Sequence, residues 1–270
     1  MLVENRKKGA AFMNNVNKTL YIPLYGKSYV SRLGILLQDP KAEQIWAEEG
    51  FSLKGKAKSK WLAYTMGMRS AVFDRWVEAR MEQEPEAIIL HAGCGMDSRC
   101  LRIRHPGRTW FDVDFPEVMA ERARYFSETA DYRMIPSDLR NMDWLQAIEK
   151  GSSAIIVMEG VSMYLTPEER NHILAQWAQH FSHISLLMDT YTTFGAKASK
   201  YKNPINEVGV TQVYGMDKPG DVTALPFLAE HDLTPEDLIR QLKPREQAIF
   251  RRLFAGSFAK KLYRLYEYRT

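Results

Sequence analysis

The sequence contains little cysteine: only Cys94 and Cys100 occur in a chain of 270 residues. Both lie near one glycine-containing segment, and their placement on the helix expected there suits neither a disulfide nor a metal site. We expect them to pack as small apolar side chains in a reducing compartment. His180 and His183 are interpreted as the end of a surface helix rather than as a ligand pair. The sequence therefore predicts no metal site.

Long apolar runs are also absent. No stretch approaches the roughly 18 apolar residues that a membrane-spanning helix needs, and the N-terminal segment has no apolar run of signal-peptide length. Lys and Arg exceed Asp and Glu by 37 to 33, and they are scattered rather than gathered in a basic patch. We therefore expect a soluble cytoplasmic protein that binds neither membrane nor nucleic acid. The sequence carries no indication of its oligomeric state.

What the chain does contain is two regions of different pattern. Residues 1–85 hold helical patterns at 40–49 and 60–82, where apolar side chains recur at roughly helical spacing. In residues 86–270, short apolar runs typical of buried strands alternate with helical stretches. We expect strands at 87–91, 109–113, 132–135, 154–158 and 184–188, and helices at 96–104, 116–129, 140–150 and 167–182. This alternation predicts one compact α/β unit, a mostly parallel sheet with helices on both faces, next to an N-terminal helical cover.

The remaining segments are less regular. We expect a loop at 195–209 and two further strands at 210–214 and 262–268, the second at the edge of the sheet. Two segments, Thr166 to Glu169 and Thr234 to Asp237, each offer a hydroxyl N-cap, a proline in the first turn and an acidic residue at the capping-box position. Both predict the start of a helix.

Two features after the first two strands indicate a ribose-bearing ligand. Gly93 and Gly95 follow the first strand, where glycine allows a sharp turn close to a ligand, although a purely structural turn would look the same. Asp114 ends the second strand, 19 residues beyond Gly95, and an acidic residue at about this spacing can bind ribose hydroxyls. Asp112 is the alternative, and we favour Asp114 because it lies nearer the ligand edge of the sheet.

Carboxylates also follow the third and fourth strands. Asp138 could accept a hydrogen bond from an adenine amino group while Leu139 packs on the ring, or Asp138 could cap a helix. Glu159 follows five apolar residues, where a charge is costly without partners. Its natural use is attraction to the ammonium or sulfonium group of a cofactor, and service as a general base is a further option.

Several ordered motifs resemble the leucine carboxyl methyltransferase family, in the bacterial branch that includes polyketide O-methyltransferases of the tetracenomycin type. The similarity covers roughly residues 20–190. The motifs are Leu24–Tyr29, Gln38–Lys41, Met68–Asp74, His91–Arg99, Phe111–Pro116, Ser137–Arg140 and Met158–Glu168.

The resemblance implies a Rossmann-like class I methyltransferase fold and S-adenosylmethionine as the cofactor. It implies that Gly93 lies near the methionine part, with Glu159 beside the amino group. Asp114 would hold the ribose, and Asp138 and Leu139 the adenine. Arg69 would reach the cofactor carboxylate, together with Lys27. His91 stands where the family often has leucine, and we interpret it as packing.

The predicted activity is O-methylation of a carboxylate or a hydroxyl on a small molecule. A carboxylate is ionised at neutral pH and needs no base, whereas a hydroxyl does. Tyr164 and Tyr191 are candidates for lining the acceptor pocket, and simple packing would explain them equally well. One alternative is an NAD-dependent oxidoreductase, which would share the glycine turn and the ribose carboxylate. It is disfavoured because Ser98 replaces the third glycine of the dinucleotide fingerprint and because Glu159 would repel a pyrophosphate. The other alternative is a non-catalytic nucleoside-binding module.

Overall fold

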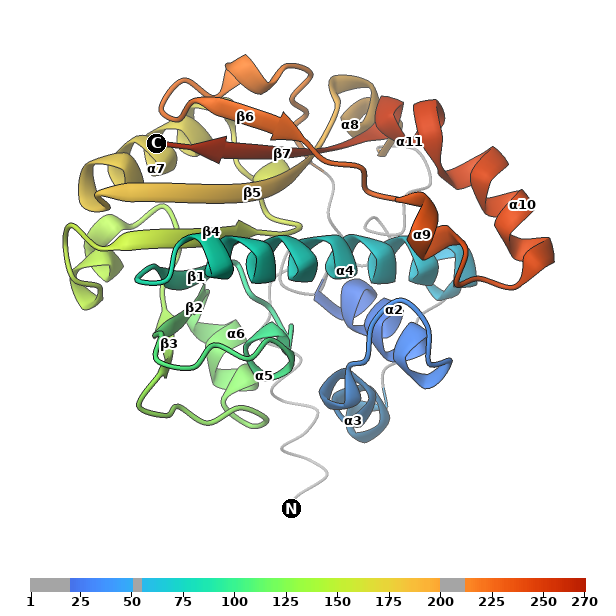
Figure 1. The fold of residues 1–270 in the computed structure, drawn as a ribbon, viewed down its shortest axis with the longest axis horizontal. Coiled ribbons are helices and arrows are strands. Elements are labelled where there is room, and N and C mark those ends of the chain that lie inside the picture. Colours follow the sequence, from blue (N-terminus) through green and yellow to red (C-terminus); the bar gives the residue numbers. More distant parts are fainter. Residues whose placement is uncertain (1–19, 51–54, 200–211) are drawn as a thin grey trace.

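The computed structural model describes residues 20–50, 55–199 and 212–270. Among them, seven strands form one sheet in the order β3-β2-β1-β4-β5-β7-β6 (Figure 1). The strands are β1 (Ile88–Ala92), β2 (Trp110–Asp114), β3 (Tyr132–Pro136), β4 (Ser153–Met158), β5 (His183–Tyr191), β6 (Phe227–Glu230) and β7 (Tyr263–Arg269). The first five pair in parallel, whereas β7 pairs antiparallel with both β5 and β6. The sheet is therefore mostly parallel, as predicted.

Helices cover both faces of this sheet. They are α2 (Tyr21–Arg32), α3 (Pro40–Glu49), α4 (Lys60–Gln83), α5 (Arg99–Arg102), α6 (Pro116–Arg122), α7 (Pro167–His180), α8 (Thr193–Ser199), α9 (Glu236–Ile239), α10 (Pro244–Phe254) and α11 (Gly256–Leu262), with short 3₁₀ helices at Gly55–Lys58, Met142–Ala147, Ser162–Tyr164 and Pro219–Asp221. The long helix α4 lies across one face (Figure 1) and buries Phe73 and Val77 against Ile89 and Val157 of the sheet. On the other face, Trp177 of α7 packs in a core with Ile156 and Leu186.

The predicted strands at 87–91, 109–113, 132–135, 154–158 and 184–188 are confirmed to within a few residues. Four of them are apolar runs that are buried along almost their whole length in a parallel sheet, and the edge strand β3 is partly exposed. The strand at 262–268 is also present, but its position was predicted wrongly. It lies inside the sheet, and the edge belongs to β6, which the sequence did not predict. The four side chains of β6 are exposed or half-exposed, and apolar and polar residues do not alternate along it. The sequence of β6 therefore lacks the pattern by which a strand is recognised.

Some predicted elements are shorter than expected. The stretches 96–104 and 116–129 contain only α5 and α6, and 140–150 contains a 3₁₀ helix. The predicted strand at 210–214 lies partly outside the described residues, and its described part makes no strand; an isolated bridge joins the neighbouring Gly215 to Tyr191. The predicted loop at 195–209 begins within α8, and the rest of it lies outside the described residues.

The two Thr-Pro-Glu segments behave differently. Thr166 caps α7 with a complete capping box, in which its hydroxyl accepts from the Glu169 N–H at 3.1 Å and the Glu169 carboxylate accepts from the Thr166 N–H at 2.8 Å. At the second segment Pro235 occupies the N-cap of α9 and the Thr234 hydroxyl caps nothing. The prediction of a capped start at Thr234 is therefore wrong, because the helix begins one residue later and is a single turn long.

This difference makes Thr166→Ala and Thr234→Ala a matched pair. Losing the capping hydroxyl of α7 should destabilise the protein by about 1 kcal/mol, whereas Thr234→Ala removes a buried hydroxyl that has no hydrogen bond and should cost much less. Urea unfolding of both variants measures the two free energies. Equal destabilisation by the two substitutions would contradict the assignment of the cap.

Candidate active site

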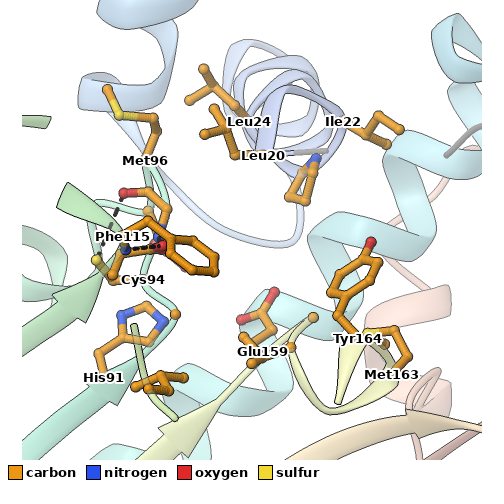
Figure 2. A pocket seen from close by; sticks show the side chains of 18 of the residues that line it. Leu20, Ile22, Leu24, His91, Cys94, Met96, Phe115, Glu159, Met163 and Tyr164 are labelled. Atoms are coloured by element: carbon orange, nitrogen blue, oxygen red, sulfur yellow. Dashed lines mark hydrogen bonds between the residues drawn. The ribbon is translucent and has the colours of Figure 1, made fainter. Parts of the chain in front are cut away.

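A cavity of about 350 Å³ opens at the carboxyl ends of the parallel strands, within the size range of small-molecule sites. Its wall comes from the segments that follow β1, β2, β3 and β4, and from α2 and α4 of the N-terminal region. In Figure 2, Cys94, Phe115 and His91 lie on one side of Glu159, and Tyr164 and Met163 on the other. All eight residues predicted to bind the cofactor line this cavity: Lys27, Arg69, Gly93, Gly95, Asp114, Asp138, Leu139 and Glu159.

The glycine turn and Asp114 form one hydrogen-bonded unit. Gly93 and Gly95 both adopt positive φ, at +70° and +53°, and a Cβ at Gly93 would stand 2.2 Å from Val161 Cγ2. The Gly95 N–H donates to Asp114 Oδ2 at 2.7 Å, and the Phe115 N–H donates to Oδ1 at 2.8 Å. Burial raises the pKa of Asp114 to about 6, although both N–H groups act in the opposite direction. This carboxylate is therefore held at the cavity wall by two backbone donors.

Asp112, the alternative to Asp114, is fully buried and faces the interior instead of the cavity. It pairs with Arg122 and accepts hydrogen bonds from Trp110 Nε1 at 2.8 Å and from the Tyr132 hydroxyl at 2.7 Å. Arg122 also donates to the carbonyl oxygens of Gly95 at 3.0 Å and Asp97 at 2.7 Å. Asp112 thus supports the glycine turn from behind, through Arg122.

Asp138 and Leu139 follow β3 and line the cavity. Asp138 Oδ1 accepts from the Arg140 backbone N–H at 3.0 Å, and Oδ2 pairs with Arg140 Nη2 at 2.5 Å. The following 3₁₀ helix is capped by Asn141, whose side chain accepts from the Asp143 N–H. The alternative role considered for Asp138, as the cap of this helix, is therefore wrong.

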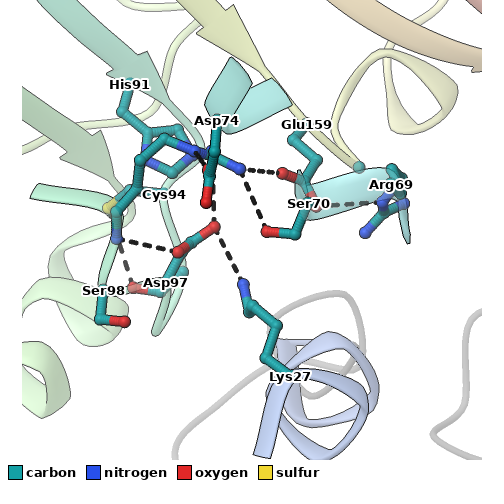
Figure 3. Close-up of polar contacts among 12 residues, drawn as sticks. Lys27, Arg69, Ser70, Asp74, His91, Cys94, Asp97, Ser98 and Glu159 are labelled. Carbon is teal, nitrogen blue, oxygen red and sulfur yellow. Dashed lines mark hydrogen bonds and ion pairs between the residues drawn. The ribbon is translucent and has the colours of Figure 1, made fainter. Parts of the chain in front are cut away.

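Glu159 lies between two arginines. Arg69 Nε donates to one oxygen at 3.0 Å (Figure 3). Arg99 Nη2 donates to the other oxygen at 2.5 Å. Burial opposes ionisation of Glu159, but Arg69, Arg99 and Lys27 outweigh it and lower the pKa to about 2. Arg69 reaches further, because its Nη1 also donates to Asp189 Oδ2 at 3.1 Å.

The contacts of Glu159 are one part of a larger buried ion-pair network. Lys27 pairs with Asp97 at 2.9 Å, and Asp97 also pairs with Arg102 at 2.7 Å. Arg99 joins these groups to the Asp74 carboxylate of α4 at 2.6 Å. Among the described residues, the network contains four cations and five carboxylates: Lys27, Arg69, Arg99 and Arg102 with Asp39, Asp74, Asp97, Glu159 and Asp189.

His91 lines the cavity and is 1% exposed. Its Nε2 lies 3.3 Å from Arg99 Nη1, which has only hydrogens to offer, so Nε2 is the acceptor and the ring is neutral. Burial first, and then Arg99, lowers the pKa of His91 to about 4, against the opposing effect of Asp112, Asp97 and Glu159. This supports the interpretation of His91 as a packing residue, with the addition that it accepts a hydrogen bond from Arg99.

Sequence reasoning missed four residues of the site: Asp97, Arg99, Asp189 and Tyr263. Asp97 and Arg99 lie in the same motif as Gly93 and Gly95, but only the two glycines were predicted to bind the cofactor. Asp189 follows the apolar run of the fifth strand, and a carboxylate after an apolar run is the signal that identified Glu159. Tyr263 had no such signal, because β7 reaches the site from the far end of the chain.

Tyr164 and Tyr191 line the cavity together with Tyr263. The rings of Tyr191 and Tyr263 meet edge to face, with centroids 5.1 Å apart. All three tyrosines pack against a small apolar cluster of Met163, Ala196 and Val213. We call this part of the wall the tyrosine-lined side of the cavity; its Tyr164 lies beyond Glu159 as seen from Phe115 and Cys94 (Figure 2).

Two further properties concern ions and membranes. Within residues 20–50, 55–199 and 212–270, no group of three or more His, Cys, Asp or Glu side chains is placed to hold a metal ion. Across the same ranges, no helix has both the length and the apolar character needed to cross a membrane.

Comparison with known proteins identifies the family. The sequence pattern of the leucine carboxyl methyltransferases matches residues 14–178, more than half of the chain, so this protein belongs to that family. A tetracenomycin polyketide synthesis O-methyltransferase, TcmP, from Streptomyces glaucescens is 26% identical over 87% of this chain and 89% of its own. The S-adenosyl-L-methionine-dependent methyltransferase dpfgK from Gibberella zeae is 25% identical over 82% of each chain. The protein is an S-adenosylmethionine-dependent methyltransferase.

Solved structures support the fold. A DUF574 family protein from Streptomyces avermitilis has a TM-score of 0.54 at 11% identity, over 86% of this chain and 89% of the other. An S-adenosylmethionine-dependent methyltransferase from Mesorhizobium loti has a TM-score of 0.50 at 15% identity, over 73% and 98%. At such identities the likeness concerns the fold alone, which is the Rossmann-like class I methyltransferase fold.

The buried neutral imidazole makes stability depend on pH. Below pH 6.5 the unfolded chain binds a proton at His91, whereas the folded protein does not until about pH 4. Stability should therefore fall as the pH is lowered through this window, by up to about 3 kcal/mol. The free energy of unfolding should fall less in His91→Gln than in the wild type between pH 7 and pH 4.5. Urea unfolding at both pH values measures this difference. Equal losses in the two proteins would show that His91 does not titrate in this way.

Proposed function

We propose that this protein O-methylates a small-molecule acceptor, with S-adenosylmethionine bound in the 350 Å³ cavity. One observation carries the proposal. At one wall of the cavity the glycine turn is hydrogen-bonded to Asp114 through the Gly95 N–H, and opposite this wall lies the Glu159 carboxylate, which two arginines hold in place. An acidic side chain beside a glycine turn suits a ribose diol, and charged groups of both signs suit the zwitterionic end of methionine.

The adenosine part would be bound by the segments after β2 and β3. Asp114 keeps lone pairs for two ribose hydroxyls while Gly95 and Phe115 hold its carboxylate still. Asp138 is half-buried and would accept from the adenine amino group, with Leu139 beside the ring. The chemistry of these donors and acceptors fits a nucleoside.

The methionine part would lie over Glu159. The Glu159 carboxylate would attract the ammonium group of the methionine part, and Arg69 and Lys27 would bind its carboxylate. Arg69 uses Nε and Nη1 within the network, and among the described contacts its Nη2 has no hydrogen-bond partner. A Cβ at Gly160 would come within 3.6 Å of this nitrogen, so the missing side chain keeps Nη2 accessible.

When bound, the cofactor supplies an activated methyl group on sulfur, and the residues of this chain orient the acceptor and exclude water. We propose that the N-terminal residues 1–85 form a cover over the α/β unit of 86–270. The residues Leu20, Ile22, Pro23, Leu62 and Met66, on or beside α2 and α4, support this role because they wall the cavity with apolar side chains.

Oxygen as the methyl acceptor is supported by the likeness to TcmP, which is named an O-methyltransferase. A small-molecule acceptor is supported by the tyrosine-lined side of the cavity. Cys94 and Cys100, both buried and free, favour a reducing compartment and hence the cytoplasm.

Asp114→Asn tests the ribose contact. The amide retains the shape of the side chain but replaces one acceptor oxygen by a donor, so affinity for S-adenosylhomocysteine should fall about tenfold to hundredfold. Calorimetry measures the dissociation constant, and the exposed Asp143→Asn serves as the control that should bind like the wild type. Unchanged affinity in a folded Asp114→Asn protein would refute the role.

The same carboxylate predicts a pH dependence of binding. Because the folded protein has a pKa of about 6 for Asp114, the ionised acceptor is lost as the pH falls below that value. Affinity for S-adenosylhomocysteine should weaken between pH 7 and pH 5 in the wild type. In Asp114→Asn this affinity should change less over the same interval. Equal decreases of affinity in both proteins would mean that a group other than Asp114 causes the pH dependence.

The methylated atom can be identified directly. A panel of phenols, carboxylic acids, amines and thiols is incubated with cofactor carrying a carbon-13-labelled methyl group, and nuclear magnetic resonance of the product methyl distinguishes oxygen from nitrogen or sulfur. We expect O-methyl products. Products methylated solely on nitrogen or sulfur would overturn the proposal.

A further inference from the structure

Three of the five N–H bonds of the Arg69 guanidinium are already used within the protein. Nε donates to Glu159 Oε1 at 3.0 Å, and Nη1 donates to Asp189 Oδ2 at 3.1 Å and to the Tyr263 hydroxyl at 2.8 Å. Because a guanidinium is flat and rigid, these acceptors fix its plane. Among the described residues none accepts a hydrogen bond from Nη2, so this nitrogen is left for a ligand.

The Asp189 carboxylate is held at both of its oxygens. Oδ1 accepts from the Gly160 N–H at 2.7 Å, and Oδ2 accepts from the Tyr263 hydroxyl at 2.5 Å as well as from Arg69. This carboxylate is fully buried, and all three partners are donors, which meets the need of a buried charge for hydrogen bonds. Asp189 thereby ties Arg69 to the backbone of Gly160, the residue whose missing side chain keeps Nη2 accessible.

Tyr263 joins these two charged side chains to each other. Its hydroxyl accepts from Arg69 Nη1 and donates to Asp189 Oδ2. Burial raises the pKa of Tyr263, Arg69 opposes this, and Asp189 and Tyr191 add to it. The phenol therefore stays neutral and keeps the proton that it donates. Its ring meets Tyr191 edge to face, with centroids 5.1 Å apart, and this contact gives the hydroxyl a defined place.

Loss of the Tyr263 hydroxyl would leave Arg69 Nη1 without one acceptor and Asp189 Oδ2 without one donor. Both needs can be met if the guanidinium turns and pairs with Asp189 through two nitrogens, the geometry that arginine and a carboxylate favour. Nη2 would then face Asp189 instead of the cavity. In the intact protein the hydroxyl supplies the contact that makes this turn unnecessary.

We propose that Tyr263 is a positioning residue for the cofactor. It holds Arg69 so that Nη2 faces the carboxylate of the methionine part, and it thereby sets the preference of the site for ligands that carry this carboxylate. Tyr263 acts through Arg69 and need not touch the carboxylate itself. The inference rests on the proposed contact between Arg69 and the methionine carboxylate, and it adds to that contact a residue of β7.

Two ligands that differ in one group test this role. S-adenosylhomocysteine carries the carboxylate, and S-adenosyl-3-thiopropylamine is the same molecule without it. In calorimetry the wild type should bind the first at least about tenfold more tightly, because the second lacks a charge-assisted contact. Tyr263→Phe should weaken S-adenosylhomocysteine binding about fivefold to tenfold and change thiopropylamine binding by less than about twofold. Equal weakening of both ligands, or unchanged binding of S-adenosylhomocysteine, overturns the inference.

A double substitution tests whether Tyr263 acts through Arg69. Lysine in Arg69→Lys keeps the charge but offers one nitrogen in place of a planar fork, so the preference for the carboxylate should shrink. Adding Tyr263→Phe to Arg69→Lys should then weaken S-adenosylhomocysteine binding by less than about twofold further, because residues that act as a unit are not additive. A second loss of about fivefold to tenfold would show that Tyr263 acts independently of Arg69, and it would overturn the inference.

Tyr266→Phe is the matched control. It removes a hydroxyl from the same strand, where Tyr266 donates to the Asp217 carbonyl at 3.3 Å away from the cavity wall, and it should leave the affinity for both ligands unchanged. Thiopropylamine binding and thermal unfolding establish that each variant is folded.

The outcomes separate this inference from the proposed function. If the wild type does not bind S-adenosylhomocysteine, or binds both ligands equally, the proposed methionine contacts fail and this inference fails with them. If the wild type prefers the carboxylate and Tyr263→Phe retains that preference in full, this inference alone fails.

Discussion

The buried ion-pair network is the constraint on which the rest of the molecule depends. An ion taken out of water loses several kcal/mol of hydration, so each member must keep its partners. Arg99, which has no solvent exposure, contacts carboxylates from α4, from its own loop and from the end of β4. Moving any one of these segments would leave a charge unpaired, and this fixes their positions relative to one another.

The network also joins the N-terminal helices to the sheet. Arg69, Ser70 and Asp74 lie along α4 and reach the ends of β1 and β4, while Lys27 reaches from α2. The apolar side of α4 shares a core with the sheet. Polar and apolar contacts therefore act on the same helix, and the cavity between α2, α4 and the strand ends keeps a defined shape.

The sequence predicted those parts of the protein whose signals are local. Apolar runs gave the parallel strands, and the glycine turn with Asp114 gave one wall of the cavity, because a strand end, a turn and a carboxylate each have their own residue pattern. The motifs shared with the family supplied Arg69 and Lys27, whose roles no spacing could reveal. The partners of these residues were not predictable, since Arg69 meets Glu159 and Asp189 across 90 and 120 residues of chain. The interior place of β7 was missed for the same reason: strand order is decided by long-range pairing, and one strand's composition does not encode it.

The interior position of β7 has a consequence for biosynthesis. Residues 263–269 leave the ribosome after every other strand of the sheet, yet they pair with β5 and β6 on either side. Until they arrive, β5 exposes an unpaired edge and Arg69 and Asp189 lack the Tyr263 hydroxyl. An open strand edge is a site for pairing with other chains. The sheet and the Tyr263 contacts of the site therefore cannot be completed until β7 has been synthesised.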